Sequence, residues 1–354
     1  MPSDVLSSRA LNRSLLARQG LLERTRTPAL EMVERLVGMQ AQVPENPYVA
    51  LWSRLVDFRP EELSELIADR RAVRAHAMRS TIHLLSARDC LAIQPVTQPV
   101  LIRGFQSPFS KGLAGADPED VAAAGLELLS QEPRTRAQLS ALLAERWPEA
   151  DPLNLAYAVT YYARLVQMPP RGLWGGSGQA TWAASDDWLG GHPDASTTLD
   201  ELVLRYLAAF GPATVADART WSGLTGLREV FERLRPQLRT FKDERGRELF
   251  DVPDAPFPDP DTPAPPRFLP EYDNVALSHD DRSRVLGADW PGQPTPGPKW
   301  IGSLLVDGFY RGRWRITIDD GAAALAIDGV EPTPEIEAEG ERLLAFVSLS
   351  PAAR

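Results

Sequence analysis

The hydrophobic positions of residues 1–110 follow a helical period first and a strand period afterwards. Apolar side chains three and four residues apart predict a helix over residues 28–37, and Asn46-Pro47 gives the cap-then-proline signal that begins a second one. A third short helix is predicted over residues 60–70. Residues 72–86 then alternate as strands do, with a break in the middle that indicates a hairpin. Helices followed by a hairpin predict a winged-helix unit over residues 1–110.

The same order recurs twice further along the chain. Residues 111–195 hold three predicted helices, followed by a hairpin over residues 168–184 with a glycine-rich tip. Residues 196–253 hold three more predicted helices and a hairpin over residues 238–252. The three units share negligible sequence identity, so the predicted repeat is one of architecture. We therefore expect three tandem winged-helix units.

The chain changes character after residue 253. Residues 254–267 are rich in proline and are predicted to form an extended connector. Residues 268–354 contain several predicted strands, the last over residues 343–348, and the Asp307-Gly308 pair between two of them is a hairpin signal. A β-rich, barrel-like C-terminal domain is expected. The predicted fold class is α+β.

The composition of the 354 residues is typical of globular proteins, with 43% hydrophobic residues. No run approaches the roughly 18 apolar residues of a membrane span, and the N-terminus lacks a secretory signal pattern, so we expect a cytoplasmic protein. The single cysteine, Cys90, excludes an internal disulfide and a cysteine-rich metal site. The four histidines are scattered along the sequence, so few residues could serve as ligands of a catalytic metal. Neither a metal nor a cofactor is expected.

The net charge of −10 argues against nucleic-acid binding if it is taken alone. Only three of the 38 basic residues are lysines, however, so the other 35 are arginines, whose planar guanidinium binds phosphate through two hydrogen bonds. Coding bias is an alternative source of the arginine excess. DNA binding requires a local basic surface rather than a basic total, so the sequence leaves it open.

Two glutamines, Gln40 and Gln42, lie two residues apart between the first two predicted helices. Their side chains would diverge in a helix, whereas they share a face in an extended segment. Pro44 disfavours helical geometry at the preceding residue, so we expect Gln42 to lie beyond the helix end. Gln40 continues the apolar face of the helix and is expected to point toward packed protein or a cleft. The pair either caps helix carbonyls or presents two amides to a substrate.

Several short stretches in a fixed order carry a family resemblance. The first are residues 36–42 (LVGMQAQ), 51–54 (LWSR) and 78–84 (MRSTIHL). With the later stretches, they resemble the AlkZ-type winged-helix DNA glycosylases, which excise bulky N7-alkylpurines. The resemblance implies that the three units form a C-shaped DNA-binding surface. The later stretches are residues 169–175 (PPRGLWG), 188–190 (WLG), 269–274 (LPEYDN) and 281–284 (DRSR).

The resemblance implies that Gln40 and Gln42 are the catalytic residues. An N7-alkyl group makes guanine a cation, so cleavage of the glycosidic bond releases a neutral base without a strong acid. The enzyme then has to place a water molecule at C1′ and stabilise positive charge there. A glutamine carbonyl can accept a hydrogen bond from that water. Some relatives carry an aspartate at the second position, so Gln42 implies dependence on a lesion that is already activated. No lysine near the motif is placed as a nucleophile, and a monofunctional glycosylase is expected.

Two further groups of residues are candidates for DNA binding. Arg79, Thr81 and His83 recur at every second position, so they are expected to share one face of a strand. That face is either solvated or, as the resemblance implies, borders the active-site cleft. The second hairpin is either a plain surface wing or an insertion into a groove of DNA. Its candidate residues are Arg171, Trp174 and Gln179, and residues expected to support the site are Asp273, Asn274, Arg282 and Arg284.

The expected function is excision of N7-alkylated purines, especially bulky or crosslinking adducts, in base excision repair or antibiotic self-resistance. The expected partner is double-stranded DNA, and the expected state is a nucleoid-associated monomer in the cytoplasm. The alternative is a non-catalytic winged-helix DNA-binding protein, either a transcriptional regulator or an adduct-sequestering protein. Such regulators usually dimerise, and no heptad pattern or dimerisation helix is evident, which favours the enzyme. A third alternative is a protein-interaction scaffold, which is supported only by the excess of acidic over basic residues.

Overall fold

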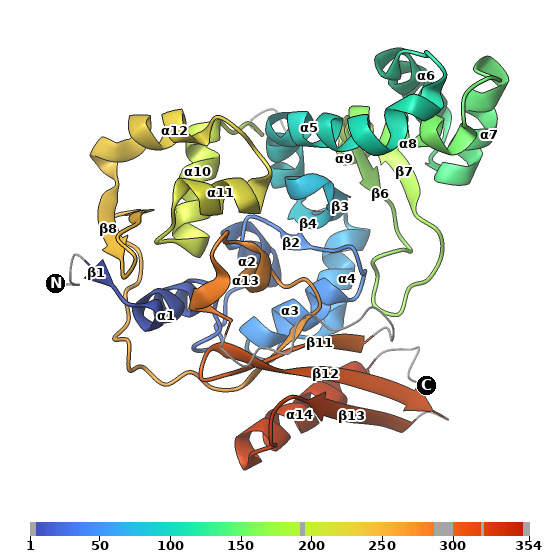
Figure 1. The fold of residues 1–354 in the computed structure, drawn as a ribbon. Helices are drawn as coiled ribbons and strands as arrows, with labels where there is room; N and C mark the ends of the chain where they lie inside the picture. Colours follow the sequence, from blue (N-terminus) through green and yellow to red (C-terminus); the bar gives the residue numbers. More distant parts are fainter. Residues whose placement is uncertain (1–4, 192–194, 287–299, 320–321, 350–354) are drawn as a thin grey trace.

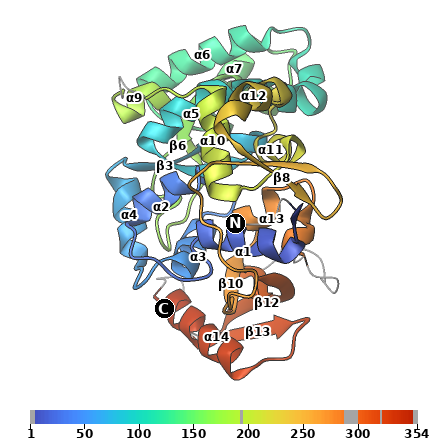
Figure 2. The same ribbon diagram turned by 90° about the vertical axis from the view of Figure 1, so that its left-hand side faces the viewer.

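The structure is a computed structural model that describes residues 5–191, 195–286, 300–319 and 322–349 (Figure 1). The described residues form helices and three separate β-sheets, which confirms the predicted α+β class. The four-stranded C-terminal sheet lies at one end of the molecule and helices α6 and α7 lie at the other, as both ribbon views show (Figures 1 and 2). Within the described residues, no helix is long and apolar enough to cross a membrane.

The central feature is a six-stranded sheet in the order β2-β4-β3-β6-β7-β5. Strand β3 (Ala72–His76) pairs with β4 (Ile82–Ser86) on one side and with β6 (Leu165–Gln167) on the other. The hairpins predicted near residues 72–86 and 168–184 are therefore joined in one sheet and are not two independent wings. The other strands of this sheet are β2 (Met39–Gln40), β5 (Arg134–Thr135) and β7 (Thr181–Ala184).

Helix α5 (Ala87–Phe109) is a 23-residue helix that the hydrophobic pattern did not predict. It contains Pro95, Pro99 and Pro108, and prolines normally break helices. The helix forms because Ser86 caps its first turn and because one face of it, from Ala87 to Phe105, is buried against α8 and the central sheet. The other helices up to residue 189 are α1 (Ser8–Arg18), α2 (Ala29–Arg35), α3 (Asn46–Arg54), α4 (Pro60–Ala68), α6 (Pro118–Gln131), α7 (Arg136–Arg146), α8 (Pro152–Tyr162) and α9 (Ser185–Leu189).

Residues 196–253 form a third group of helices, and a separate three-stranded sheet in the order β1-β8-β9 accompanies this group. Strands β8 (Arg239–Asp243) and β9 (Glu248–Asp251) form the predicted hairpin, and β1 (Val5–Leu6) pairs in parallel with β8. Helix α1 packs against α10, so the N-terminal segment belongs spatially with this third group. The helices of the group are α10 (Leu199–Phe210), α11 (Val215–Ser222) and α12 (Leu227–Leu234).

The C-terminal strands form an antiparallel sheet in the order β10-β11-β12-β13. The outer strands β10 and β13 do not pair in the part of the chain that the structure describes, so no closed barrel is found there. The predicted turn at Asp307-Gly308 joins β11 to β12 and is confirmed. The strands are β10 (Arg267–Pro270), β11 (Trp300–Val306), β12 (Phe309–Asp319) and β13 (Ala322–Asp328).

The prediction of a strand over residues 343–348 is wrong, because most of this segment lies in helix α14 (Pro334–Val347). Thr333 caps the helix by accepting a hydrogen bond from the Ile336 amide, and Pro334 occupies its first position. Ile336, Leu343, Phe346 and Val347 are all buried and recur at helical spacing. A short apolar run by itself cannot distinguish a strand from the buried face of such a helix.

Candidate active site

The glutamine pair begins where helix α2 stops. Val37 and Gly38 both have a positive φ, 55° and 88°, and this left-handed turn ends the helix and leads directly into β2. Strand β2 pairs with β4 so that Gln40 lies opposite His83. Gln40 is therefore on a strand rather than on a continued helix face, in contrast to the prediction. Strand β2 ends at Gln40, and Gln42 lies in the bend that follows, where it is exposed.

The orientation of both glutamine amides is fixed by groups that can only donate hydrogen bonds. Arg79 donates from Nη2 to Oε1 of Gln40 at 2.8 Å. The backbone N–H of Ile82 donates to Oε1 of Gln42 at 3.0 Å. Neither donor can face an amide NH2 group, so the two NH2 groups point the other way. Neither NH2 group has a hydrogen bond within the described residues. Each carbonyl keeps one lone pair, and each NH2 its two hydrogens, for a substrate or a water molecule.

Asn274 ties the motif to the C-terminal part of the chain. Its Nδ2 donates to the carbonyl of Gly38 at 2.7 Å, and its Oδ1 accepts from the backbone N–H of Gln40 at 3.4 Å. The neighbouring Asp273 is not free for catalysis. It caps α13 (Asn274–Leu277) and forms a buried ion pair with both Nη atoms of Arg54, at 2.8 and 2.9 Å. Asp273 is thus occupied by a structural role.

Arg79 lies on the 3₁₀ helix η1 (Met78–Ser80), not on the strand where the alternating pattern placed it. Both Arg79 and Ser80 have a positive φ, 55° and 58°, a conformation that non-glycine residues rarely adopt. The guanidinium of Arg79 donates to the carbonyl of Trp221 at the end of α11 as well as to Gln40. Burial, and then the charge of Arg282, lowers the pKa of Arg79 to about 10, so it is cationic at neutral pH.

His83 is buried next to Arg79 and stays neutral. Burial, and then the Arg79 charge, lowers the pKa of His83 to about 3. Its Nδ1 lies 3.0 Å from the carbonyl of Thr81, which only accepts, so the ring proton is on Nδ1 and Nε2 faces Arg79 at 3.5 Å. The hydroxyl of Thr81 donates to the carbonyl of Met78 and closes the turn. Arg79 and His83 therefore meet at Gln40, whereas the Thr81 hydroxyl is engaged elsewhere.

Residues 168–180, between β6 and β7, form an irregular loop rather than a short exposed hairpin. Trp174 in this loop is partly buried, and its ring packs against Tyr48, Trp300 and Phe346 at centroid distances of 4.8, 5.2 and 5.1 Å. Burying this large ring against other aromatic rings is more favourable than exposing it. Arg171 is partly buried and donates to the Gly178 carbonyl, whereas Gln179 is exposed.

The two remaining predicted residues lie on the 3₁₀ helix η4 (Arg282–Arg284). Arg284 is buried, donates to the Pro212 carbonyl at 2.7 Å and lies 3.8 Å from a carboxylate oxygen of Asp217. It stabilises the contact of η4 with the third helical group. Arg282 is partly exposed, and its side chain has no hydrogen bond or ion pair within the described residues.

The sequence analysis missed Arg74, a buried residue of β3. Its Nη2 donates at 2.7 Å to the carbonyl of Ala41, the residue between the two glutamines. Nε and Nη1 have no hydrogen-bond partner within the described residues. Burial, and then the charge of Arg171, lowers the pKa of Arg74 to about 10. The only sequence signal was an arginine inside a strand of mostly apolar residues.

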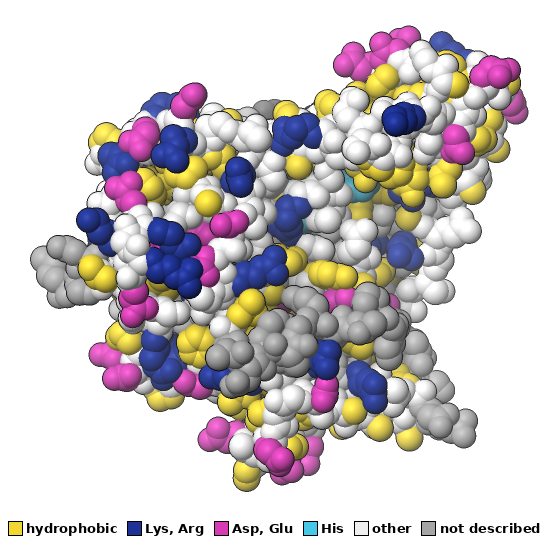
Figure 3. All heavy atoms as spheres, viewed as in Figure 1, with side chains coloured by type: hydrophobic (Ala, Val, Ile, Leu, Met, Phe, Trp, Pro, Cys, Tyr) yellow, Lys and Arg dark blue, Asp and Glu magenta, His cyan; other side chains and the backbone are white. Residues whose placement is uncertain are grey.

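Charges are unevenly distributed on the face drawn in Figure 3. Acidic side chains gather at the tip formed by α6 and α7 and around α14, while many basic side chains lie across the middle of this face. The net charge of −10 is therefore compatible with a basic central surface. The described residues contain no group of three or more His, Cys, Asp or Glu that could hold a metal ion.

Comparison with known proteins identifies the class. The family model for AlkZ-like DNA glycosylases matches residues 33–346, so the chain belongs to this family and is a DNA glycosylase. Among solved structures, the DNA glycosylase AlkZ of Streptomyces sahachiroi has a similar fold. The TM-score is 0.74, with 98% of each chain covered at 20% sequence identity. A comparison with curated proteins found no match.

Proposed function

We propose that this DNA glycosylase is monofunctional and hydrolyses the N-glycosidic bond of N7-alkylated purines, including bulky or crosslinking adducts. The observation that carries the proposal is the composition of the site. Two oriented amides, Gln40 and Gln42, meet an arginine and a neutral histidine, and no carboxylate hydrogen-bonds to either glutamine within the described residues. A site without a strong base suits a base that alkylation has already turned into a good leaving group.

In the proposed reaction, the oxygen of a water molecule forms a bond to C1′ while the C1′–N9 bond breaks. The electron pair of that bond moves into the cationic purine, which leaves as a neutral N7-alkyl base. The remaining lone pairs of the Gln40 and Gln42 carbonyls hold the water, and their dipoles stabilise the positive charge that develops on the sugar. Glutamine does not act as a base, so the proton of the attacking water passes to solvent.

The proposal includes the way in which DNA is bound. Residues 1–110, 111–195 and 196–253 would form tandem winged-helix units around a C-shaped surface that grips the duplex. The order of helices before the hairpins β3–β4, β6–β7 and β8–β9 supports this arrangement. Arg171 and Gln179 would contact DNA from the loop beside Arg74. The protein would act as a monomer on nucleoid DNA, in repair or in self-resistance to an alkylating antibiotic.

An excision assay tests the proposal. The substrates are one duplex with a single N7-methylguanine and another with a bulky N7 adduct, and the free base and the DNA strand are measured separately. We expect release of the base and an intact strand that breaks only after alkali treatment. Base release from neither duplex would refute the N7-alkylpurine assignment, and strand cleavage without alkali would refute the monofunctional mechanism.

A further inference from the structure

The hydrogen-bond ladder between β2 and β4 becomes irregular at Ala41, the residue between the two glutamines. The register of the two strands places Ala41 opposite Ile82, and the backbone N–H of Ala41 donates to the Ile82 carbonyl at 2.8 Å. In a regular antiparallel pair, the N–H of Ile82 would return a hydrogen bond to the Ala41 carbonyl. That N–H instead donates to Oε1 of Gln42 at 3.0 Å. A side-chain carbonyl thus takes the place of a backbone carbonyl.

The carbonyl of Ala41 has a different partner. It accepts a hydrogen bond from Nη2 of Arg74 at 2.7 Å. Arg74 lies on β3, which is separated from β2 by β4, so its side chain spans the width of one strand. A buried carbonyl without a partner would be costly, and Arg74 supplies that partner. This hydrogen bond therefore keeps the Ala41 carbonyl out of the ladder and leaves the Ile82 N–H free for Gln42.

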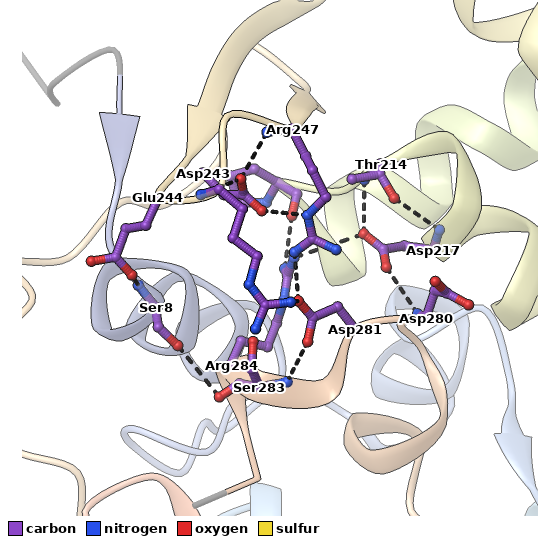
Figure 4. Close-up of polar contacts among 12 residues, drawn as sticks. Ser8, Thr214, Asp217, Asp243, Glu244, Arg247, Asp280, Asp281, Ser283 and Arg284 are labelled. Atoms are coloured by element: carbon purple, nitrogen blue, oxygen red, sulfur yellow. Dashed lines mark hydrogen bonds and ion pairs between the residues drawn. The ribbon is translucent and has the colours of Figure 1, made fainter.

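Arg74 is 2% exposed, yet no carboxylate pairs with it. Figure 4 shows the more usual arrangement, in which Arg247 donates to the carboxylates of Asp243 and Asp281, both at 2.6 Å. Arg74 forms no ion pair within the described residues, and its Nε and Nη1 have no hydrogen-bond partner there. Burying a cation that binds only one backbone carbonyl is unfavourable for stability. A role in the site therefore accounts for Arg74 better than a role in the fold.

The loop of residues 168–180 packs against Arg74. Gly172 of this loop has a φ of 100°, and a Cβ on it would lie 2.6 Å from Cδ of Arg74. The backbone of Gly172 is anchored, because its carbonyl accepts a hydrogen bond from the hydroxyl of the buried Tyr48 at 2.8 Å. This close approach restricts the Arg74 side chain and so favours the conformation that reaches the Ala41 carbonyl.

We propose that Arg74 is a positioning residue for Gln42. By holding the Ala41 carbonyl, it keeps the Ile82 N–H available to Oε1 of Gln42. It thereby fixes the amide of a glutamine that is otherwise exposed. Arg74 is too deeply buried to touch the substrate. The inference rests on the proposed function, in which Gln42 holds the attacking water, and it adds a residue on another strand that determines the geometry of this amide.

The test is a double-mutant cycle between Arg74 and Gln42. Arg74→Met keeps a long side chain but has no donor, so the Gln42 amide should lose its fixed orientation. Base release from an N7-methylguanine duplex should slow by about 10- to 100-fold under single-turnover conditions, with little change in Kd. The same substitution should cause no further loss in Gln42→Ala, because both changes act through one amide. Losses that multiply, or full activity of Arg74→Met, would overturn the inference.

Gly172→Ala gives the same test if circular dichroism shows that Arg74→Met does not fold. Its methyl group should displace the Arg74 side chain, so it should slow base release in the wild-type background but not in Gln42→Ala. Gly115→Ala is the matched control, because Gly115 has a similar φ of 91° and nothing within 4 Å of its Cβ position. This control should release the base at the wild-type rate. Equal rates for the two glycine variants would contradict the inference.

A crystal structure of Arg74→Met or Gly172→Ala gives a readout that does not depend on activity. We expect the Ile82 N–H to donate to the Ala41 carbonyl and the Gln42 amide to have turned away. An unchanged hydrogen bond between Ile82 and Gln42 would overturn the inference even if the rate fell. The rates of the wild type and of Gln42→Ala test the proposed function separately, since a fully active Gln42→Ala would remove Gln42 from the mechanism.

Discussion

At the scale of single residues, the proposed site contains two amides whose orientation is set by hydrogen-bond donors. Gln40 faces the guanidinium of Arg79, and Gln42 faces the backbone N–H of Ile82. Both NH2 groups and one lone pair on each carbonyl therefore point away from these partners. In the proposed mechanism the pair therefore holds a water molecule through these groups, and an amide cannot deprotonate it.

The first prediction concerns Gln40→Ala and Gln42→Ala. Each should slow base release by about 10²-fold under single-turnover conditions, because an oriented dipole acts mainly in the transition state. The Kd for damaged duplex should change little. Gln42→Glu should retain activity or extend it to less labile lesions, since a carboxylate can activate water. Full activity of the double alanine variant would place the catalytic groups elsewhere.

The second prediction concerns the effect of pH on the rate. The pKa of His83 is lowered to about 3 and that of Arg79 to about 10, so neither changes its charge between pH 6 and pH 8. The single-turnover rate of N7-methylguanine release should therefore be flat over this range. A bell-shaped profile with a limb near pH 6.5 would show that a histidine acts as an acid or a base, contrary to this mechanism.

The third prediction concerns stability in acid. The folded-state pKa of His83 lies near 3, below its ordinary value of 6.5, so the unfolded chain takes up a proton first as the pH falls. The stability that neutral His83 contributes is complete above pH 6.5 and is lost progressively between pH 6.5 and pH 3. Each pH unit costs about 1.4 kcal/mol per such group. Urea unfolding at pH 7.5 and 5.0 should show a smaller loss for His83→Gln than for the wild type, and equal losses would contradict the assignment.

At the scale of elements, the turn before β2 positions the glutamines. Gly38 has a φ of 88°, and a Cβ there would lie 2.5 Å from the side chain of Leu85 and 3.1 Å from the carbonyl of Leu84. Gly246, in the β8–β9 turn, also has a positive φ, but nothing lies within 4 Å of its Cβ position. The two glycines form a matched pair, because they share the backbone strain and differ in the available space.

The fourth prediction uses this pair. Gly246→Ala should cost about 1 to 2 kcal/mol of stability, the typical penalty for a side chain in left-handed geometry, and should leave excision intact. Gly38→Ala adds a clash with β4, so it should displace β2, cost more stability and slow base release. Urea unfolding and single-turnover excision measure the two effects. Equal behaviour of the two variants would mean that the turn does not position Gln40.

Helices and strands were predicted correctly from the sequence where local signals are strong. The predictions failed where tertiary packing determines the secondary structure. The hairpin over residues 238–252 and the turn at Asp307-Gly308 follow from glycine and turn chemistry, which act locally. Helix α5 was missed because it contains three prolines, which usually interrupt helices. Burial of one face of the helix outweighs this tendency. Residues 343–348 were assigned to a strand because a short apolar run has no period long enough to identify a helix.

At the scale of the whole molecule, charge placement matters more than total charge. The fifth prediction is that the affinity for duplex DNA falls with increasing salt despite the net charge of −10, because arginines that neutralise phosphates release counterions. Measurement of Kd between about 50 and 200 mM salt checks this, and the logarithmic slope counts the phosphate contacts. A flat response would remove the proposed DNA-binding surface.

The sequence by itself determined the start of most helices, the turns of the β8–β9 and β11–β12 hairpins and the glutamine pair, because caps, prolines and turn residues act over a few positions. The family resemblance also pointed to Arg79 and Asn274. Only the tertiary structure decided what these residues do. Gln40 contacts Arg79, which is 39 positions away in the sequence, and Asn274, which is 234 positions away. The ring of Trp174 likewise packs against Phe346 of α14. Such partners come from distant parts of the chain, and no local pattern encodes which of them will meet.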